Sequence, residues 1–200
     1  MKQLEDAFKA LEIEYDEEKI NKYEQYMQGV LKWNKVLNLT TITEKEEFIK
    51  KHYIDSVICA KFDEFKNANS IIDIGTGAGF PGVPLAIIAA DKKFTLVDSS
   101  NKKIKVVEEL CSEIKISNIK VIHGRAEDLG NSKLHREKYD LCVAKAVAKL
   151  SVLVEYCLPF VAVGGYLLAY KGPELDNEIE IAQKAIDELG GQIEKIEKIV

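Results

Sequence analysis

The residues best suited to hold a ligand lie in the stretch "DIGTGAGFPG", residues 73–82. Gly75, Gly77 and Gly79 alternate with other small residues, which permits a tight turn and lets a ligand lie against the backbone. The stretch differs from the dinucleotide fingerprint G-x-G-x-x-G because position 80 is Phe. It also differs from a phosphate-binding P-loop, because no G-K-[ST] follows the glycines. The spacing therefore argues against both a phosphate site and a dinucleotide site.

Two later segments favour the interpretation that the ligand is a nucleoside. Asp98 ends the apolar run "FTLVD", and a carboxylate at the end of a second strand can accept hydrogen bonds from ribose hydroxyls. In "HGRAEDL", Ala126 and Glu127 are positioned to border an adenine. The alternative is that the glycines only allow close packing of helix on strand, which is the interpretation we prefer for Gly82, Gly164 and Gly165.

The elements that must position these residues follow an alternating pattern from Ser70 onward. Short Val/Ile/Leu-rich strands alternate with helices, which predicts an α/β fold with a mostly parallel sheet covered by helices on both faces. Expected strands are Ser70–Ile74, Lys93–Asp98, Ile119–Gly124, Tyr139–Ala144, Tyr166–Tyr170 and the closing stretch "QIEKIEKIV" at 192–200. Expected helices are Val83–Ala89, Asn101–Lys115, Lys149–Phe160 and Glu174–Leu189.

The first part of the chain is predicted to be helical. "EEKINKYEQYMQGVLKWNKVLN" has apolar residues at the helical period after a capping Asp16, and a second helix is expected over Lys45–Ala60. We therefore expect a helical appendage at residues 1–62 that packs on a ligand-binding domain at 63–200.

Composition limits the class of protein. Hydrophobic residues make up 46% and charged residues 30% of the 200 residues, which is typical of a soluble globular chain. The apolar runs are too short to span a membrane, and the four separated cysteines indicate reduced thiols in a cytoplasmic protein rather than a disulfide or metal site. The net charge of −5 argues weakly against nucleic-acid binding, but residues 51–171 carry an excess of three positive charges.

Longer strings point to one family. The spacing D-x-G-x-G-x-G resembles the first motif of class I methyltransferases that use S-adenosylmethionine, whose fold is Rossmann-like. "WNKVLNLTTI", "HYIDSV", "IIDIGTGAGFPGVPLAI", "LVDSSNKKIKVVEEL", "VAKAVAKL" and "YKG" occur in one order between residues 33 and 172. Together they resemble the bacterial small-subunit ribosomal RNA methyltransferase G family, also called glucose-inhibited division protein B. The resemblance implies methylation of N7 of a guanine in the 530 loop of 16S rRNA, with 16S rRNA or a small-subunit precursor as partner.

The resemblance also implies which residues hold the cofactor. They lie after successive strands, namely Gly75, Gly77, Gly79, Phe80, Asp98, Ser99, Ser100, Ala126, Glu127 and Lys145. The family usually has Arg where this chain has Lys145, and lysine lacks the planar fork that grips an anion in two places. Family members typically close with an antiparallel hairpin. We expect only one of its strands before Val200, so that the sequence is either a shortened version or lacks the final antiparallel strand.

The expected chemistry needs no catalytic dyad. N7 of guanine has an in-plane lone pair and no proton, so holding the reactants in line supplies most of the catalysis and no catalytic residue is assigned. Methylation of an amino group typically uses an N/D-P-P-Y/F segment, whereas residues 143–146 read "VAKA". Cys142 lies among apolar residues of a strand, where we expect an inert thiol.

Basic residues beyond the strand ends are the candidates for RNA contact. They are Arg125, Lys145, Lys149 and Lys171. Phe80 and Pro81 are candidates for stacking on the cofactor or on a flipped guanine. We expect a monomer. Two other functions stay open, a small-molecule methyltransferase and a nucleoside-binding module without catalysis, while a nicotinamide oxidoreductase is least favoured because of Phe80.

Overall fold

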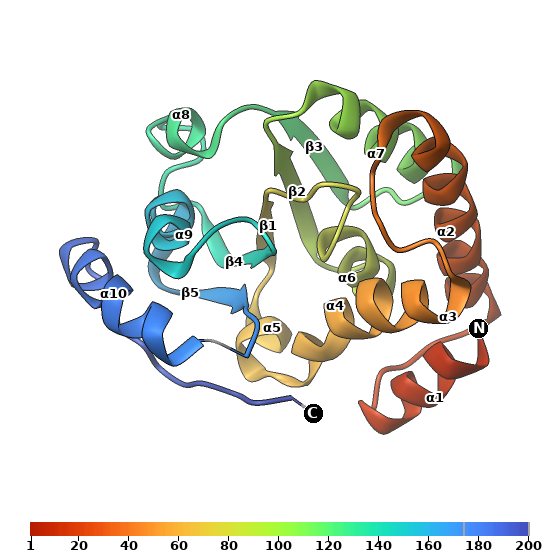
Figure 1. Cartoon of the computed structure of the whole chain (residues 1–200), viewed down its shortest axis with the longest axis horizontal. Coiled ribbons are helices and arrows are strands. Elements are labelled where there is room, and N and C mark those ends of the chain that lie inside the picture. Colours follow the sequence, from red (N-terminus) through yellow and green to blue (C-terminus); the bar gives the residue numbers. More distant parts are fainter. Residues whose placement is uncertain (174, 200) are drawn as a thin grey trace.

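The computed structural model describes residues 1–173 and 175–199. One five-stranded parallel sheet with the order β3-β2-β1-β4-β5 forms the centre of the fold (Figure 1). The strands are β1 (Ser70–Ile74), β2 (Lys93–Asp98), β3 (Ile119–His123), β4 (Tyr139–Lys145) and β5 (Val161–Tyr170). The predicted α/β class is confirmed, and β1 and β2 have the bounds expected from the sequence.

The helices cover both faces of the sheet. On one face lie α2 (Glu17–Leu37), α6 (Gly82–Ile88) and α7 (Asn101–Glu113), and on the other lie α8 (Ala126–Gly130), α9 (Leu150–Cys157) and α10 (Leu175–Glu188) (Figure 1). The remaining helical elements are α1 (Lys2–Ala10), α3 (Lys45–Phe48), a π-helical turn (Ile49–Ile54), α4 (Asp55–Val57), a 3₁₀ turn (Ile58–Lys61), α5 (Asp63–Asn67) and a second 3₁₀ turn (Leu158–Phe160). No helix among the described residues is long and apolar enough to cross a membrane.

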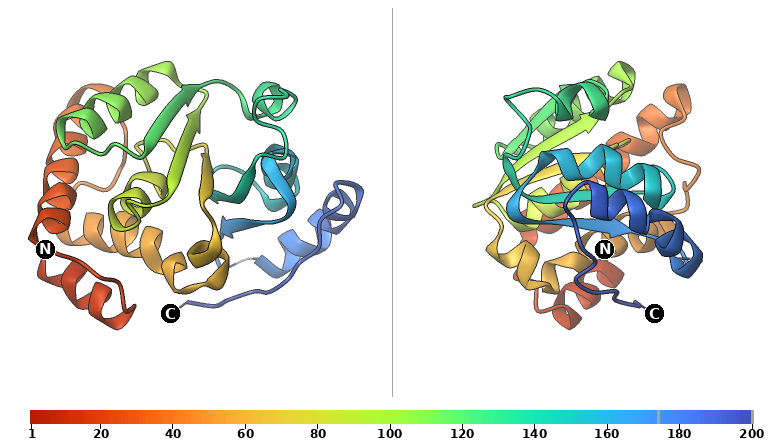
Figure 2. Two further views of the ribbon diagram at one scale, coloured as in Figure 1. Left: turned by 180° about the vertical axis from the view of Figure 1, so that it is seen from behind. Right: turned by 90° about the vertical axis from the view of Figure 1, so that its left-hand side faces the viewer.

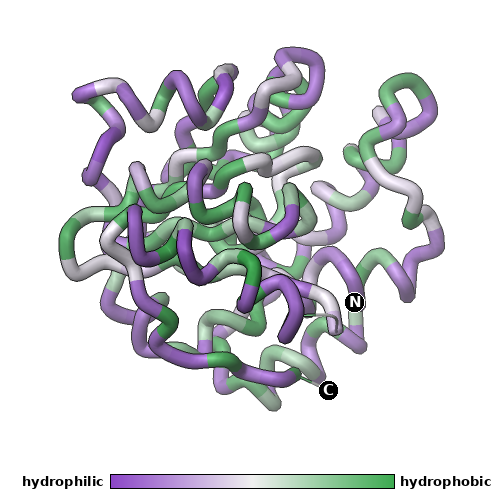
Figure 3. The backbone as a smooth tube through the Cα atoms, turned by 60° about the vertical axis from the view of Figure 1, so that its left-hand side comes forward, coloured by the Kyte–Doolittle hydropathy of each residue, from purple (hydrophilic) through white to green (hydrophobic). Residues whose placement is uncertain are grey.

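The strands divide their side chains between two hydrophobic cores. Ile71 and Val143 belong to the core that also contains the N-terminal helices, whereas Ile72 and Cys142 belong to the core under α9 and α10. This division follows from the alternation of side chains along a strand. Apolar segments accordingly gather inside the molecule while hydrophilic ones run along the outer helices (Figure 3).

The N-terminal helices pack along one side of the sheet (Figure 2). Helix α2 begins as predicted, because the carboxylate of Asp16 accepts a hydrogen bond from the amide of Lys19 at 2.7 Å. Side chains of α2 such as Tyr23 and Val30 are fully buried in the same core as the sheet residue Leu96. The division of the chain at residue 62 stays a prediction.

The C-terminal segment differs from the expectation. Residues 192–199 form no strand, although their Ile residues alternate with charged ones, and Val200 lies outside the described residues. A strand needs a backbone ladder, whereas this segment is held by side chains. Lys195 forms a 2.9 Å ion pair with Glu64 and lies 4.7 Å above the ring of Phe62.

Strand β5 begins at Val161 and not at the predicted Tyr166. The prediction started too late because two glycines interrupt the apolar pattern of the strand. Its pairing with β4 shifts register between Tyr139 and Leu141, which is where the chain passes through Gly164 and Gly165. The interpretation as close packing of helix on strand is confirmed for Gly82, where a β-carbon would come within 2.8 Å of Asp73. Gly165 is also close-packed, but against the backbone of the neighbouring strand β4, where a β-carbon would lie 2.7 Å from the carbonyl of Asp140. The interpretation is wrong for Gly164, which has open space around it and a φ of +81°.

Candidate functional site

The glycine loop turns back between β1 and α6 at the carboxyl edge of the sheet. The amides of Gly75 and Thr76 both donate to the carbonyl of Val97 in β2, at 2.8 Å and 3.0 Å. The three glycines meet different surroundings. A β-carbon on Gly75 would lie 2.7 Å from Val147, and one on Gly79 would collide with Tyr26 and Val83. Gly77 alone faces open space, with only the carbonyl of Gly75 at 4.0 Å, so the middle of the loop is where a ligand can approach the backbone.

Asp98 joins the glycine loop to the second strand. One carboxylate oxygen accepts a hydrogen bond from the amide of Gly77 and the other accepts one from the amide of Ser100, both at 2.8 Å. Asp98 is 9% exposed. Each oxygen keeps a second lone pair, which can accept a bond from a hydroxyl group of a ligand.

The third strand ends beside Asp98. His123 is the register partner of Asp98, and its Nε2 donates to the carbonyl of Ser99 at 3.1 Å. The amide of Gly124 donates to the carbonyl of Asp98 at 3.1 Å. Ala126 and Glu127, which begin α8, follow directly. The structure thus brings together the segments predicted from the first three strands, and their contacts with a cofactor stay a prediction.

Asp73 lies beneath the loop and is 1% exposed. Its Oδ2 accepts from the hydroxyl of Thr76 at 2.6 Å and from the amide of Gly82 at 2.8 Å, while its Oδ1 is buried with no partner among the described residues. Burial raises the pKa of this carboxyl to about 7, against the lowering effect of its two hydrogen bonds. Asp73 therefore links the start of α6 to the loop and titrates near neutral pH.

Phe80 packs toward the N-terminal helices. Its ring stacks on His52 with centroids 4.4 Å apart and an interplanar angle of 8°, and it makes edge contacts with Tyr26 and Phe48. Phe80 is 8% exposed. One face of the ring is thus occupied by His52, and stacking of Phe80 on a cofactor or a guanine stays a prediction.

Lys145, at the end of β4, points toward the π-helical turn. Its ammonium group donates to the carbonyl of Lys51 and lies 3.7 Å from the carboxylate of Asp55. Burial lowers the pKa of Lys145, and the nearby carboxylate of Asp55 opposes that effect. The same ammonium group and burial lower the pKa of His52 to about 4, with burial the larger cause. Lys145 thus faces the N-terminal helices in this structure, and its role toward a cofactor or RNA stays a prediction.

The four candidates for RNA contact fall into two pairs. Lys171 forms a 2.5 Å ion pair with Glu178 of α10 and donates to the carbonyl of Ala148 at 3.0 Å, so it holds α10 against the loop after β4. Lys145 is also engaged, as described above. Arg125 and Lys149 are exposed, and among the described residues neither side chain forms an ion pair.

Sequence reasoning missed the side chains that support the loop and the helix that follows it. Tyr26 of α2 donates its hydroxyl to the carbonyl of Ala78 at 2.9 Å, and Tyr23 donates to the carbonyl of Pro84 at 2.6 Å. Val147 lies against Gly75 from the other side. The signal for the tyrosines was their three-residue spacing, which puts both hydroxyls on one face of a helix.

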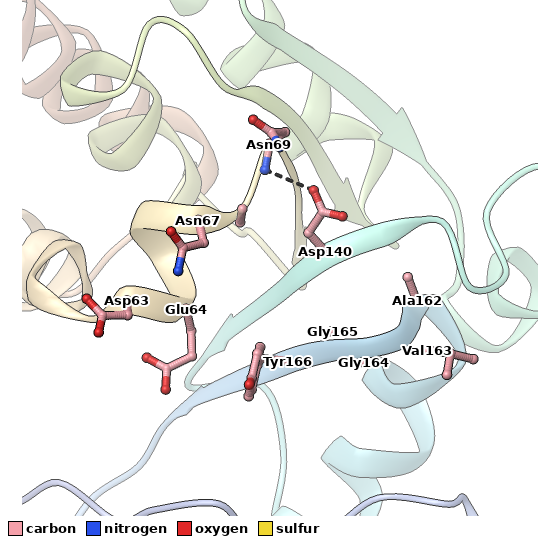
Figure 4. Close-up of a pocket in the computed structure, with 11 residues that line it drawn as sticks. Asp63, Glu64, Asn67, Asn69, Asp140, Ala162, Val163, Gly164, Gly165 and Tyr166 are labelled. Atoms are coloured by element: carbon pink, nitrogen blue, oxygen red, sulfur yellow. Dashed lines mark hydrogen bonds between the residues drawn. The ribbon is translucent and has the colours of Figure 1, made fainter.

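Two cavities lie elsewhere in the molecule. One, of about 300 Å³, is bordered by Asp63, Asn69 and Asp140 at the opposite edge of the sheet, where Asp140 accepts a hydrogen bond from the amide of Asn69 (Figure 4). The other, of about 940 Å³, runs along β5 toward the C-terminal segment and reaches Lys145 at one end. Among the described residues that line these two cavities, none belongs to the glycine loop and none is Asp98.

Comparison with solved structures identifies the fold. The chain superposes on the ribosomal protein L11 methylase of Lactobacillus delbrueckii subsp. bulgaricus with a TM-score of 0.56 at 18% identity, over 75% of this chain and 74% of that one. It superposes on an O-methyltransferase from Bacillus cereus, solved in complex with SAH, with a TM-score of 0.55 at 15% identity, over 82% and 79% of the two chains. These similarities show a methyltransferase fold.

Sequence comparison gives a much closer relationship. The chain is 50% identical over 184 residues to the ribosomal RNA small subunit methyltransferase G of Clostridium tetani, covering 92% of this chain and 77% of the relative. It is 46% identical over 193 residues to the protein of the same name from Clostridium novyi, covering 96% and 79%. The family model described as "GidB: rRNA small subunit methyltransferase G" matches residues 19–200. The chain therefore belongs to the rRNA small subunit methyltransferase G family.

Proposed function

We propose that this protein transfers the methyl group of S-adenosylmethionine to N7 of a guanine in the 530 loop of 16S rRNA. The observation that carries the proposal is the junction of the glycine loop with Asp98, found in a chain of the rRNA small subunit methyltransferase G family. The junction couples an open stretch of backbone at Gly77 to a carboxylate at the neighbouring strand end.

The residues present fit this cofactor. A β-carbon at Gly77 would enter open space, so the loop leaves room for a ligand directly against the backbone. The carboxylate of Asp98 is held in place by two amides and retains lone pairs for ribose hydroxyls. When bound there, S-adenosylmethionine supplies an electrophilic methyl group on a sulfonium centre.

The protein's own contribution is to position the reactants. Guanine N7 already carries its lone pair, so no side chain has to remove a proton, and orientation alone can supply about 7–11 kcal/mol of the barrier reduction. The glycine loop is suited to that task because β2, α2 and the loop after β4 all contact it. A rigid site of this kind needs little reorganisation during the reaction.

A residue of β4 argues against methylation at cytosine C5, a reaction that requires a cysteine nucleophile. Cys142 is fully buried in β4, and burial raises the pKa of its thiol well above the usual value. The thiol is therefore inaccessible and protonated, which favours a target atom that attacks without covalent help from the enzyme.

The partner in this proposal is 16S rRNA, either free or in a small-subunit precursor. Arg125 and Lys149 are the exposed cations of the candidate set and would contact its phosphates. The same proposal puts the protein in the cytoplasm, where the substrate is assembled, and acting as a monomer. The buried free cysteines Cys59, Cys111 and Cys157 suit a reducing compartment.

The test is methyl transfer in vitro. Purified protein, labelled S-adenosylmethionine and small subunits from cells that lack this methylation are mixed, and the modified base is identified by mass spectrometry of nuclease fragments. We expect 7-methylguanosine in the 530 loop with wild-type protein and strongly reduced incorporation with Asp98→Asn. Labelling of a different atom, or none on either free 16S rRNA or subunits, would contradict the proposal.

A further inference from the structure

Helix α2 contacts the glycine loop through the hydroxyl of Tyr26. This side chain is fully buried, and its hydroxyl donates to the carbonyl of Ala78 at 2.9 Å. The ring also packs edge-on against Phe80, with centroids 6.1 Å apart. A residue from the N-terminal helices therefore fixes the backbone of the loop from the side of α2.

Gly79 is required by this contact. A β-carbon at position 79 would overlap the hydroxyl of Tyr26 and would come within 2.7 Å of Val83. The φ of +89° at Gly79 is also one that side chains rarely adopt. Gly79, the third glycine of the loop, thus leaves the space that the hydroxyl of Tyr26 occupies, whereas Gly77 leaves the open side of the loop free.

The two anchors act on adjacent residues. Asp98 holds the amide of Gly77 and Tyr26 holds the carbonyl of Ala78, so the peptide units before and after the one that joins Gly77 to Ala78 are both fixed. The other amides of the loop, from Gly75 to Phe80, also have acceptors, but among the described residues the N–H of Ala78 has none. That N–H is the donor that the loop leaves for an acceptor atom of a ligand.

We propose that Tyr26 is a positioning residue of the cofactor site, which acts by orienting the Gly77–Ala78 peptide through its hydrogen bond to Ala78. The inference rests on the proposed function, since it takes the loop as the seat of S-adenosylmethionine. It assigns to the N-terminal helices a share of the cofactor affinity, although none of their residues need touch the cofactor.

The chain offers a matched control one turn earlier in the same helix. Tyr23 is also fully buried, and its hydroxyl donates to a backbone carbonyl at 2.6 Å. That carbonyl belongs to Pro84 within α6 rather than to the loop. Substitution of either tyrosine by Phe removes one buried hydroxyl from the same core, but only Tyr26→Phe releases the loop.

The experiment compares Tyr26→Phe with Tyr23→Phe in the full chain. Calorimetry measures the dissociation constant of S-adenosylhomocysteine, urea unfolding measures stability, and steady-state kinetics with small subunits give separate KM values for S-adenosylmethionine and for subunits. We expect Tyr26→Phe to weaken binding of S-adenosylhomocysteine by about three- to tenfold, the ratio that one hydrogen bond commonly supplies. Its KM for S-adenosylmethionine should rise by a similar factor while its KM for subunits is unchanged. Tyr23→Phe should change the dissociation constant by less than about twofold at a comparable loss of stability.

Hydrogen exchange of the apo protein gives a second measurement that does not depend on binding. The amides of Gly79 and Phe80, which donate to the carbonyl of Thr76, should exchange faster in Tyr26→Phe and not in Tyr23→Phe. Equal dissociation constants and equal exchange rates in Tyr26→Phe and Tyr23→Phe would overturn this inference and leave the proposed function standing. Failure of the wild-type protein to bind S-adenosylmethionine or S-adenosylhomocysteine would overturn the proposed function, and the inference with it.

Discussion

The carboxylate of Asp98 accepts a hydrogen bond from the amide of Gly77 at 2.8 Å, so the end of β2 holds the open part of the glycine loop. The same carboxylate accepts from the amide of Ser100, which fixes its orientation. One side chain thereby sets both the shape of the loop and the position of an acceptor for the ligand.

Substitution of Asp98 by Asn should therefore weaken ligand binding in two ways. The amide group can accept only one of the two backbone hydrogen bonds, and it offers a ribose hydroxyl a weaker acceptor. We expect S-adenosylhomocysteine to bind at least about tenfold more weakly, as measured by calorimetry. Asp91→Asn, an exposed site just before β2, is the control and should bind like wild type.

Alanine at Gly77 and at Gly79 should have different consequences. At Gly77 the new β-carbon enters open space, so the cost in unfolding free energy is the left-handed backbone strain of about 1–2 kcal/mol. At Gly79 the β-carbon also meets Tyr26 and Val83, which adds about 1–3 kcal/mol of overpacking. Urea unfolding should therefore rank Gly79→Ala as the less stable variant, while Gly77→Ala folds and fails to bind S-adenosylhomocysteine. Normal binding by Gly77→Ala would show that the ligand does not approach the loop there.

The buried carboxyl of Asp73 should make stability depend on pH. Its pKa is about 7 in the folded protein against an ordinary value of 3.8, so the folded state binds this proton more tightly than the unfolded state. Between about pH 4 and pH 7 this group therefore lowers the free energy of unfolding as pH rises, and the contribution is constant above pH 7. In Asp73→Asn this dependence should be absent. The measurement is the difference in unfolding free energy between wild type and Asp73→Asn at several pH values, and a difference that does not change with pH would contradict the assignment.

His52 should stay neutral well below its ordinary pKa. Burial and the ammonium group of Lys145 hold the pKa at about 4 in the folded protein, against 6.5 ordinarily. The stability that depends on the neutral ring is thus lost as pH falls from 6.5 to about 4. In Lys145→Gln the pKa of His52 should rise but remain below 6.5, because burial persists. An NMR titration of the histidine rings measures it, with Lys149→Gln as the control. An unchanged value in Lys145→Gln would show that the two side chains do not interact.

Alanine substitutions of the RNA-contact candidates should differ in how they change the salt dependence of RNA binding. Arg125→Ala and Lys149→Ala should each reduce the magnitude of the slope of log affinity for 16S rRNA against log salt by about 1, since the proposed function assigns each side chain one phosphate contact. Lys171→Ala breaks the ion pair with Glu178, so we expect a lower melting temperature and an unchanged slope. The opposite pattern, with the slope reduced only in Lys171→Ala, would move the RNA surface toward α10.

The sequence predicted features whose cause is local. The bounds of β1 and β2 follow from short apolar runs that end in a glycine or a polar residue, and the start of α2 follows from the capping Asp16. The shared edge of Gly77 and Asp98 was also predictable, because parallel strands place their carboxyl ends together.

Features that depend on distant partners were not predictable in this way. The stacking of His52 on the ring of Phe80 joins residues from two distant segments and has no local signal. Lys171 looks like a free cation until α10 supplies Glu178. The C-terminal Ile alternation suggests a strand, but alternation gives only a face, and pairing requires a neighbouring backbone that residues 192–199 do not have.

The contact between Tyr26 and Gly79 has an evolutionary consequence. A larger residue at position 79 is tolerable only if position 26 gives up its hydroxyl, and a tyrosine at position 26 is tolerable only opposite a glycine. The two positions lie on different elements, yet a tyrosine at position 26 requires a glycine at position 79. Among relatives of this protein, every sequence with tyrosine at position 26 should therefore have glycine at position 79, which ties the N-terminal helix to the glycine loop.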